Sequence, residues 1–300
     1  MIKGIHHVSA LTKSFSENHH FYSDILGLRL VKNTVNQDNI HMRHLFYGDY
    51  TGSPGTLLTF FEVPRIGSSY NERAFFGNIT LGIPKGTSSY WKKRLNDFAI
   101  SFQKEGQTLT LQDPDTMGII LTEIPETISN PTIHTDIPAE KQIVRIIGAD
   151  YHVPNPAATS QFFTDLFGLE SQNGVLVDKD KTSFAKLHAT SSDKKSRTGR
   201  GTIDHIAYTV ETKEAVDELH DIAVRNDLKI EEFVDREYFK SLYIREPGGL
   251  RIEVASAGPG FTIDEPLETM GDNLALPSFL EEKRTEIETY FGGDLSLLKI

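Results

Sequence analysis

The chain has 300 residues, a net charge of −11 at neutral pH and no cysteine. Its length allows two domains of ordinary size, and 38% hydrophobic residues are enough to form their cores. The acidity argues against binding of nucleic acid or of an anionic membrane surface. The lack of cysteine excludes disulfides and favours the cytoplasm, and no signal peptide or stretch of 18 apolar residues occurs.

Four similar modules follow one another along the chain. Each begins with a short apolar strand, a helical stretch follows, and about three short alternating strands complete the unit. Four copies of this βαβββ unit predict an α+β protein. The four opening strands are expected at residues 7–12, 78–83, 148–153 and 205–210.

Helical spacing of apolar residues predicts one helix in each module. Residues 162–169, with the sequence FFTDLFGL, echo residues 21–28, with the sequence FYSDILGL. Gly27 should end the first helix in a left-handed conformation. The helices of modules one, two and four are expected at residues 16–26, 89–105 and 213–226.

Composition changes mark the segments between modules. Residues 126–141 are rich in Pro, Thr and Ser and form the expected domain boundary. Residues 191–201 are polar and basic and are expected to form a mobile loop, and residues 279–291 a short helix. The predicted division is an N-terminal domain with modules one and two, a C-terminal domain with modules three and four, and a tail, at residues 1–130, 142–260 and 261–300.

A strand-turn-strand run ends in an isolated carboxylate, Glu253, among apolar residues. A charge in such a position costs several kcal/mol unless it is paired or bound to a cation. His7 and His205 occupy matching positions in the opening strands of modules one and four. Two histidines and one carboxylate form the facial triad that is typical of non-haem Fe(II) sites.

A single metal site built from His7, His205 and Glu253 restricts how the four modules can pack. Because the candidate ligands come only from modules one and four, those two modules must lie together. We therefore expect module one to pack against module four, and module two against module three.

This pattern of four modules resembles the vicinal oxygen chelate superfamily, which includes glyoxalase I, bleomycin-resistance proteins and type I extradiol dioxygenases. The resemblance covers roughly residues 3–257 and implies two curled mixed-sheet barrels. It also implies that strand-start histidines and strand-end carboxylates meet on a metal. The matching positions are His7 and Phe60 in module one, Asn78 and Thr122 in module two, Gly148 in module three, and His205 and Glu253 in module four.

The resemblance thus leaves metal ligands only at His7, His205 and Glu253. It implies Fe(II) as the cofactor, and Mn(II) or another divalent metal could occupy the same site. Glu62 and Glu123, close to the strand ends of modules one and two, are expected to be rim or structural carboxylates.

Residues 236–243, with the sequence REYFKSLY, resemble bacterial ring-cleaving dioxygenases associated with quinone and methylhydroquinone detoxification. Arg236 stands where the extradiol signature has histidine. Together with Tyr243, and with His6 before the first ligand, this variant resembles the hydroquinone-cleaving enzymes. Asp204 departs from their closest branch, which has histidine before the second ligand.

The resemblance implies catalytic roles for Arg236, Tyr243 and His6. A hydroquinone can bring only one oxygen to a metal, so Tyr243 and His6 are expected to bind substrate and move protons. Arg236 would stabilise negative charge. Plainer interpretations remain: Arg236 could only pair with Glu232 or Glu237, and Tyr243 could be a core residue.

His6 points away from His7 by strand alternation, so any contribution passes through its neighbour. The remaining histidines are expected to be structural, namely His19, His20, His41, His44, His134, His152, His188 and His220.

The leading hypothesis is an Fe(II)-dependent dioxygenase that opens a hydroquinone-type aromatic diol in aromatic or quinone detoxification. Its partners would be a small aromatic substrate and O2, with a homo-oligomer as a further possibility. One alternative is a glyoxalase-like metal-dependent lyase or isomerase, which would need a second carboxylate where this chain has Phe60. The other is a metal-free drug-binding protein of the bleomycin-resistance type.

Overall fold

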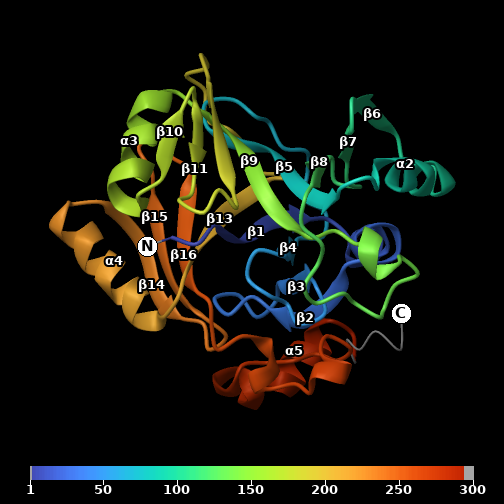
Figure 1. The fold of residues 1–300 in the computed structure, drawn as a ribbon. Helices are drawn as coiled ribbons and strands as arrows, with labels where there is room; N and C mark the ends of the chain where they lie inside the picture. Colours follow the sequence, from blue (N-terminus) through green and yellow to red (C-terminus); the bar gives the residue numbers. More distant parts are fainter. Residues whose placement is uncertain (1, 294–300) are drawn as a thin grey trace.

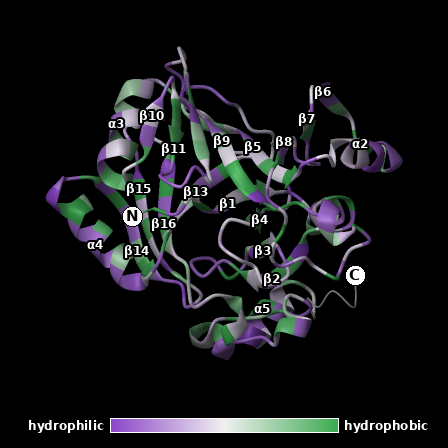
Figure 2. Ribbon diagram, in the orientation of Figure 1, coloured by the Kyte–Doolittle hydropathy of each residue, from purple (hydrophilic) through white to green (hydrophobic). Residues whose placement is uncertain are grey.

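Sixteen strands form two eight-stranded mixed sheets in residues 2–293, the part of the chain that the computed structural model describes (Figure 1). No helix in this part is long and apolar enough to cross a membrane. The apolar side chains of both sheets face a shared core, which explains the alternation of green and purple along the strands in Figure 2.

The first sheet combines modules one and four. Strand β1 pairs with β13 in antiparallel orientation at the centre of this sheet, which joins the beginning of the chain to its last third. The strand order is β14 (Lys229–Asp235), β15 (Lys240–Arg245), β16 (Arg251–Ser256), β13 (Ile203–Val210), β1 (Ile5–Thr12), β4 (Leu57–Glu62), β3 (Arg43–Gly48) and β2 (Arg29–Val35).

The second sheet combines modules two and three through the antiparallel pair β5 and β9. The predicted pairing of modules is therefore confirmed. The strand order is β10 (Glu170–Gln172), β11 (Val175–Val177), β12 (Phe184–Ala189), β9 (Arg145–Val153), β5 (Phe75–Pro84), β8 (Gly118–Ile124), β7 (Thr108–Gln112) and β6 (Phe102–Glu105).

Both sheets are curled, as expected, but they stay open and do not close into barrels. In the described part of the chain the outermost strands, β14 and β2, are not paired with each other. The α+β class is confirmed, and the arrangement of strands and helices is the one that the resemblance to the vicinal oxygen chelate superfamily implies. Each sheet takes one module from residues 1–130 and one from residues 142–260, and the division into those domains stays a prediction.

The helices cover the outer faces of the sheets and differ from the expectation in two modules. The predicted helix at 16–26 is divided into an α-helical turn and a π-helical segment, and Gly27 follows with the expected positive φ of 73°. The predicted helix at 89–105 is too long, because Ala99 adopts a φ of 56° and β6 begins soon after. The helices are α1 (Phe15–His19), η1 (His20–Ile25), α2 (Ser88–Asp97), α3 (Pro156–Phe167) and α4 (Lys213–Arg225), with a short 3-10 turn η2 (Ala139–Lys141).

The segment at residues 191–201, expected to be mobile, is paired with the chain between modules one and two. Tyr70 and Arg197 exchange two backbone hydrogen bonds, of 2.9 and 3.0 Å, and the Arg200 amide donates to the Gly67 carbonyl at 2.9 Å. Polar composition alone did not reveal this pairing partner, which lies more than a hundred residues earlier in the sequence.

The C-terminal extension packs along β2, the free edge of the first sheet (Figure 1). Its apolar residues Leu274, Leu276, Leu280 and Ile287 form one cluster with Val35. The predicted helix at 279–291 is present but begins as 3-10 structure. The extension contains η3 (Phe261–Ile263), η4 (Leu267–Thr269), η5 (Ser278–Lys283) and α5 (Arg284–Tyr290).

A buried ion pair anchors this extension. The side chain of Lys32 on β2 is fully buried, and its ammonium lies 2.7 Å from Asp264 and 2.5 Å from Glu265. Tyr238, which lines the cavity described below, donates a hydrogen bond to the same Asp264 at 2.6 Å. The extension thereby supports both β2 and one wall of the cavity.

Replacing Lys32 with methionine should lower the free energy of unfolding by about 3 kcal/mol, because it leaves two carboxylates without their buried partner. Urea denaturation of the variant and of the unchanged protein measures this difference. Lys93→Met is the matched control, because the exposed Lys93–Asp97 pair should contribute under about 0.5 kcal/mol. Equal stability of the two variants would contradict the anchoring role of Lys32.

Candidate metal centre

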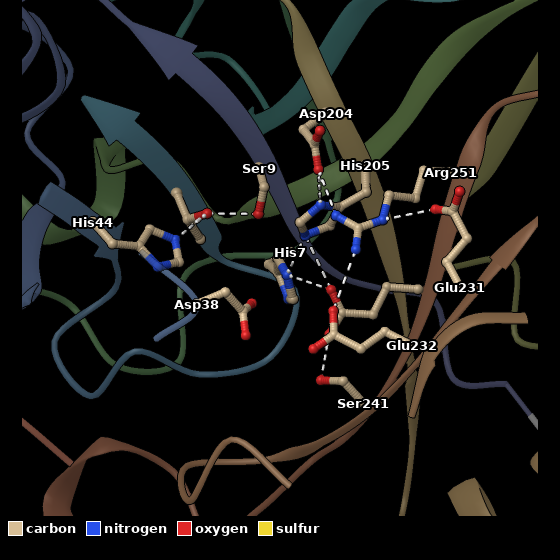
Figure 3. Close-up of polar contacts among 12 residues, drawn as sticks. His7, Ser9, Asp38, His44, Asp204, His205, Glu231, Glu232, Ser241 and Arg251 are labelled. Atoms are coloured by element: carbon tan, nitrogen blue, oxygen red, sulfur yellow. Dashed lines mark hydrogen bonds and ion pairs between the residues drawn. The ribbon is translucent and has the colours of Figure 1, made fainter. Parts of the chain in front are cut away.

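Three adjacent strands of the first sheet bring His7, His205 and Glu253 together. The residues lie on β1, β13 and β16, and their exposed fractions are 2%, 3% and 0%. The two Nε2 atoms are 3.3 Å apart, and Oε2 of Glu253 lies 3.1 Å from Nε2 of His7 and 3.0 Å from that of His205 (Figure 3). The parallel pairing that sets Glu253 opposite Ala207 places the carboxylate beside both rings.

These atoms fit a divalent metal ion. Two ligand atoms at right angles, each about 2.1 Å from an ion, lie about 3.0 Å apart, whereas tetrahedral ligands lie about 3.4 Å apart. The observed separations of 3.0–3.3 Å are close to one face of an octahedron. Moreover, Oε2 of Glu253 is buried with no hydrogen-bond partner, while Oε1 accepts from Ser241 at 2.6 Å. A cation would satisfy the free oxygen.

The residue before each histidine orients its ring. Nδ1 of His7 lies 2.9 Å from Nδ1 of His6, and Nδ1 of His205 lies 2.7 Å from a carboxylate oxygen of Asp204. Burial and the neighbouring His7 lower the pKa of His6 to about 3, so His6 is neutral and its Nδ1 can accept a hydrogen bond from the Nδ1–H of His7. Nδ1 of His7 and Nδ1 of His205 thus act as donors, and the Nε2 atoms of both rings face the position of the metal.

Asp204 has a larger role in the site than the sequence indicated, because it contacts both His205 and Arg251. Burial raises the pKa of its carboxyl, but the hydrogen bond from His205 and the charge of Arg251 outweigh this and hold the pKa below its usual range. Burial lowers the pKa of His205, but the hydrogen bond to Asp204 and the negative charge of Glu253 outweigh burial and raise the pKa to about 9. A metal ion that binds at Nε2 would replace the proton there. The available signal in the sequence was a carboxylate directly before a candidate ligand.

A small cavity of about 50 Å³ opens beside His7 and His205. Arg236 and Tyr243 line it, as expected, and its apolar walls are Phe46, Phe61 and Phe239. His6, which was expected to bind substrate, does not line it; its ring instead contacts His7 and packs against Phe239 at 5.2 Å between centroids. A second groove, of about 810 Å³, lies behind Asp204 and Arg251 and contains none of the three ligand candidates, so we place the site in the smaller cavity.

Arg236 combines the two interpretations that the sequence left open. It lines the cavity, and its guanidinium also pairs with Glu232 at 2.5 Å and with Asp38 at 3.0 Å. The other expected partner, Glu237, instead accepts hydrogen bonds from Ser278. These pairs hold the guanidinium in place at the cavity wall.

Tyr243 is opposite Glu253 in the antiparallel pair of β15 and β16. Its ring lies 4.2 Å from the guanidinium carbon of Arg251, and its centroid is 5.4 Å from that of His205. Burial and the charge of Glu253 raise the pKa of the Tyr243 phenol well above 10. The hydroxyl therefore keeps its proton and can donate a hydrogen bond into the cavity.

His44 lines the cavity, although the sequence placed it among the structural histidines. It lies on β3 and its Nε2 is 3.2 Å from Oγ1 of Thr59. In the sequence nothing distinguishes His44 from the other scattered histidines. Only the pairing of β3 with β4 brings it to the same concave face as His7.

The strand-end positions of the other modules need a correction. His205 pairs with Arg251, and Glu253 lies two residues after Arg251. In module one His7 pairs with Leu57, so the corresponding residue, two positions later, is Thr59 and not Phe60. A shift of one residue reverses the side to which a strand residue points. The corresponding residues of modules two and three are Ile120 and Lys186, instead of Thr122 and an unassigned position.

Glu62 and Glu123 are structural, as predicted. Glu62 accepts a hydrogen bond of 2.7 Å from the amide of Phe15, and Glu123 one of 2.9 Å from the amide of Ser88. Each carboxylate therefore caps the beginning of the helix in its own module. Neither residue contributes to the three-residue centre.

Comparison with known proteins decides the family. The chain is 36% identical over 308 aligned residues to "Putative ring-cleaving dioxygenase MhqA" of Bacillus subtilis, covering 96% of this chain and 97% of that one. The chain belongs to the ring-cleaving dioxygenases of the glyoxalase/bleomycin resistance protein/dioxygenase superfamily. The profile of this superfamily matches residues 144–254.

Two further relatives of this dioxygenase are informative. A crystal structure of a putative dioxygenase from Bacillus subtilis superimposes with a TM-score of 0.89, at 29% identity and with 96% of each chain covered. "Chlorohydroquinone/hydroquinone 1,2-dioxygenase" of Sphingobium indicum is 28% identical, with 95% of each chain covered. The dioxygenase family therefore extends over both sheets and the C-terminal extension.

Proposed function

We propose that this dioxygenase uses Fe(II), held by His7, His205 and Glu253, to open the ring of hydroquinone-type diols. The observation that carries the proposal is the convergence of these three buried ligands beside a small cavity with aromatic walls. A bound Fe(II) held by these three residues would have coordination positions left for the substrate and O2. Mn(II) or another divalent ion would fit the same donors.

The protein's own residues would bind the substrate and handle its protons. Tyr243 keeps its proton and donates a hydrogen bond to a substrate oxygen, while Arg236 provides permanent positive charge where negative charge develops. His6 and Asp204 hold the two ligand rings in place. Phe46, Phe61 and Phe239 line the cavity, where they would pack against the aromatic ring of the substrate.

Several observations support an aromatic diol of small size. The cavity of about 50 Å³ is small compared with the roughly 300–1,000 Å³ of sites for drug-sized ligands. The Sphingobium indicum relative is named for chlorohydroquinone and hydroquinone. Arginine at 236 in place of the extradiol histidine favours the same substrate class.

We further propose a cytoplasmic enzyme that acts in quinone detoxification and that forms a homo-oligomer.

The test is oxygen consumption by the Fe(II)-loaded protein with hydroquinone, methylhydroquinone and catechol. We expect kcat/KM for the two hydroquinones to exceed that for catechol at least tenfold, about 1.4 kcal/mol of transition-state stabilisation. A catechol chelates iron with adjacent oxygens, whereas a hydroquinone needs distal donors of the kind that Arg236 and Tyr243 provide.

The same assay separates the alternatives. A tenfold preference for catechol would overturn the substrate class and leave the metal site intact. Metal binding without ring opening of any diol would favour the lyase or isomerase. Tight binding of an aromatic compound by protein that takes up no metal would favour the drug-binding protein.

A further inference from the structure

A chain of three polar side chains crosses the cavity wall from β1 through β4 to β3. Oγ of Ser9 lies 2.6 Å from Oγ1 of Thr59, and Oγ1 of Thr59 lies 3.2 Å from Nε2 of His44 (Figure 3). Ser9 and His44 both line the cavity beside His7. Ser9 follows His7 by two residues on the same strand face. The three polar side chains therefore extend from the position beside the first ligand to the wall formed by β3.

The ring of His44 is held in one orientation. It packs against Phe46 at a tilt and stacks on Phe61, with both centroid separations at 4.1 Å, while Nε2 lies next to the hydroxyl of Thr59. The other nitrogen, Nδ1, lies on the side of the ring away from Thr59 (Figure 3). Within residues 2–293 no side chain or backbone group forms a hydrogen bond with this Nδ1.

The ring of His44 is also uncharged. Burial and the neighbouring His7 and His205 lower its pKa well below 6.5. A neutral imidazole has one donor and one acceptor nitrogen, so Nδ1 can pair with a hydroxyl in either direction. His44 is half-buried, so Nδ1 is accessible to a hydroxyl of a ligand in the cavity.

We propose that His44 binds the distal hydroxyl of the aromatic diol and so selects para diols over ortho diols. This inference rests on the proposed function. His44 lies two strands from β1, about 10 Å across the sheet. Its pairing through Phe61 sets it level with Leu11, beyond His7 along the strand. Its ring turns back to Thr59, which is opposite Ser9. A ring with one oxygen at the metal centre therefore directs its para oxygen toward His44. The second oxygen of a catechol lies beside the first and does not extend to this wall.

The test measures binding, separately from turnover. Isothermal titration calorimetry under nitrogen gives the dissociation constants of hydroquinone and of phenol, which lacks the distal hydroxyl, for the Fe(II)-loaded protein. His44→Phe should weaken hydroquinone binding about tenfold and phenol binding less than twofold, since one hydrogen bond to the hydroxyl is lost. His44→Gln, which keeps hydrogen-bonding groups, should recover part of the affinity.

His220→Phe is the matched control, because His220 stacks on Phe233 at the same 4.1 Å but lies on α4, outside the cavity. It should leave both constants unchanged. Equal weakening of hydroquinone and phenol by His44→Phe, or no weakening, would overturn the role of His44. If His44→Phe does not fold, Thr59→Val is the second test. Loss of the hydroxyl next to Nε2 should weaken the binding of hydroquinone and leave the binding of phenol unchanged. An unchanged ratio of the two dissociation constants would overturn the inference.

Failure of the proposed function gives a different result. In that case the unchanged protein consumes no O2 with hydroquinone and binds hydroquinone no more tightly than phenol, before any variant is compared. Normal turnover of hydroquinone by the unchanged protein, with no selective effect at His44, overturns only the assignment of His44.

Discussion

Glu253→Gln should lower the affinity for Fe(II) at least about 100-fold and reduce ring-cleaving turnover to the background. Replacing even a residue that only orients a metal ligand costs roughly 10–100-fold in affinity, and Glu253 is the sole carboxylate among the three converging residues. A neutral amide is a poor ligand, and it leaves two buried histidines without their counter-charge. Metal analysis after reconstitution, and titration with Fe(II) or Mn(II), measure the loss.

Glu62→Gln is the matched control for this change. Glu62 is also a strand-end glutamate of the first sheet, but it accepts a hydrogen bond from the Phe15 amide, which a glutamine oxygen can still accept. Metal affinity should therefore change less than twofold. A Glu253→Gln protein that still binds one equivalent of metal with unchanged affinity would contradict the proposed centre.

Arg236→Ala should reduce kcat/KM for hydroquinone about 100-fold with the metal content unchanged. Removing one donor that stabilises developing negative charge in a closed site costs roughly 10²–10³ in rate. Arg236 is suited to this role because Glu232 and Asp38 hold its guanidinium at the cavity wall. Arg236→Lys keeps the charge and loses the planar fork, so it should recover only part of the rate.

Arg245→Ala serves as the control for the arginine. Arg245 lies on β15 and pairs with Glu231 at 2.6 Å, outside the small cavity. Its replacement should change kcat/KM less than twofold. Unchanged turnover of Arg236→Ala would reduce Arg236 to an ion-pair partner of Asp38 and Glu232. Loss of metal in this variant would show that its effect is structural.

Local patterns were sufficient to predict the repeat, the pairing of modules and the three converging residues. Strand alternation revealed a carboxylate among apolar residues at Glu253, and the repeat placed His7 and His205 in matching strands. One site made from modules one and four requires those modules to be adjacent, and the pairing of β1 with β13 confirms it. These inferences depend on residue type and spacing, which are properties of the linear chain.

Register was less accessible, because a slip of one residue reverses the face of a strand. The sequence therefore indicated Phe60 where pairing with β1 places Thr59. One helix end was also missed. Ala99 adopts a positive φ that ends helical structure before β6, and alanine is a residue type that gives no indication of such a conformation.

The cavity itself was a product of long-range packing. His44 becomes a wall residue only because β3 joins β4 and the sheet curls toward His7. Lys32 is buried only because the C-terminal extension returns to the edge of the sheet, where Asp264 and Glu265 meet its ammonium. The chain thus encodes its ligands locally, whereas the groups that surround them depend on contacts between residues far apart in sequence, which no local pattern specifies.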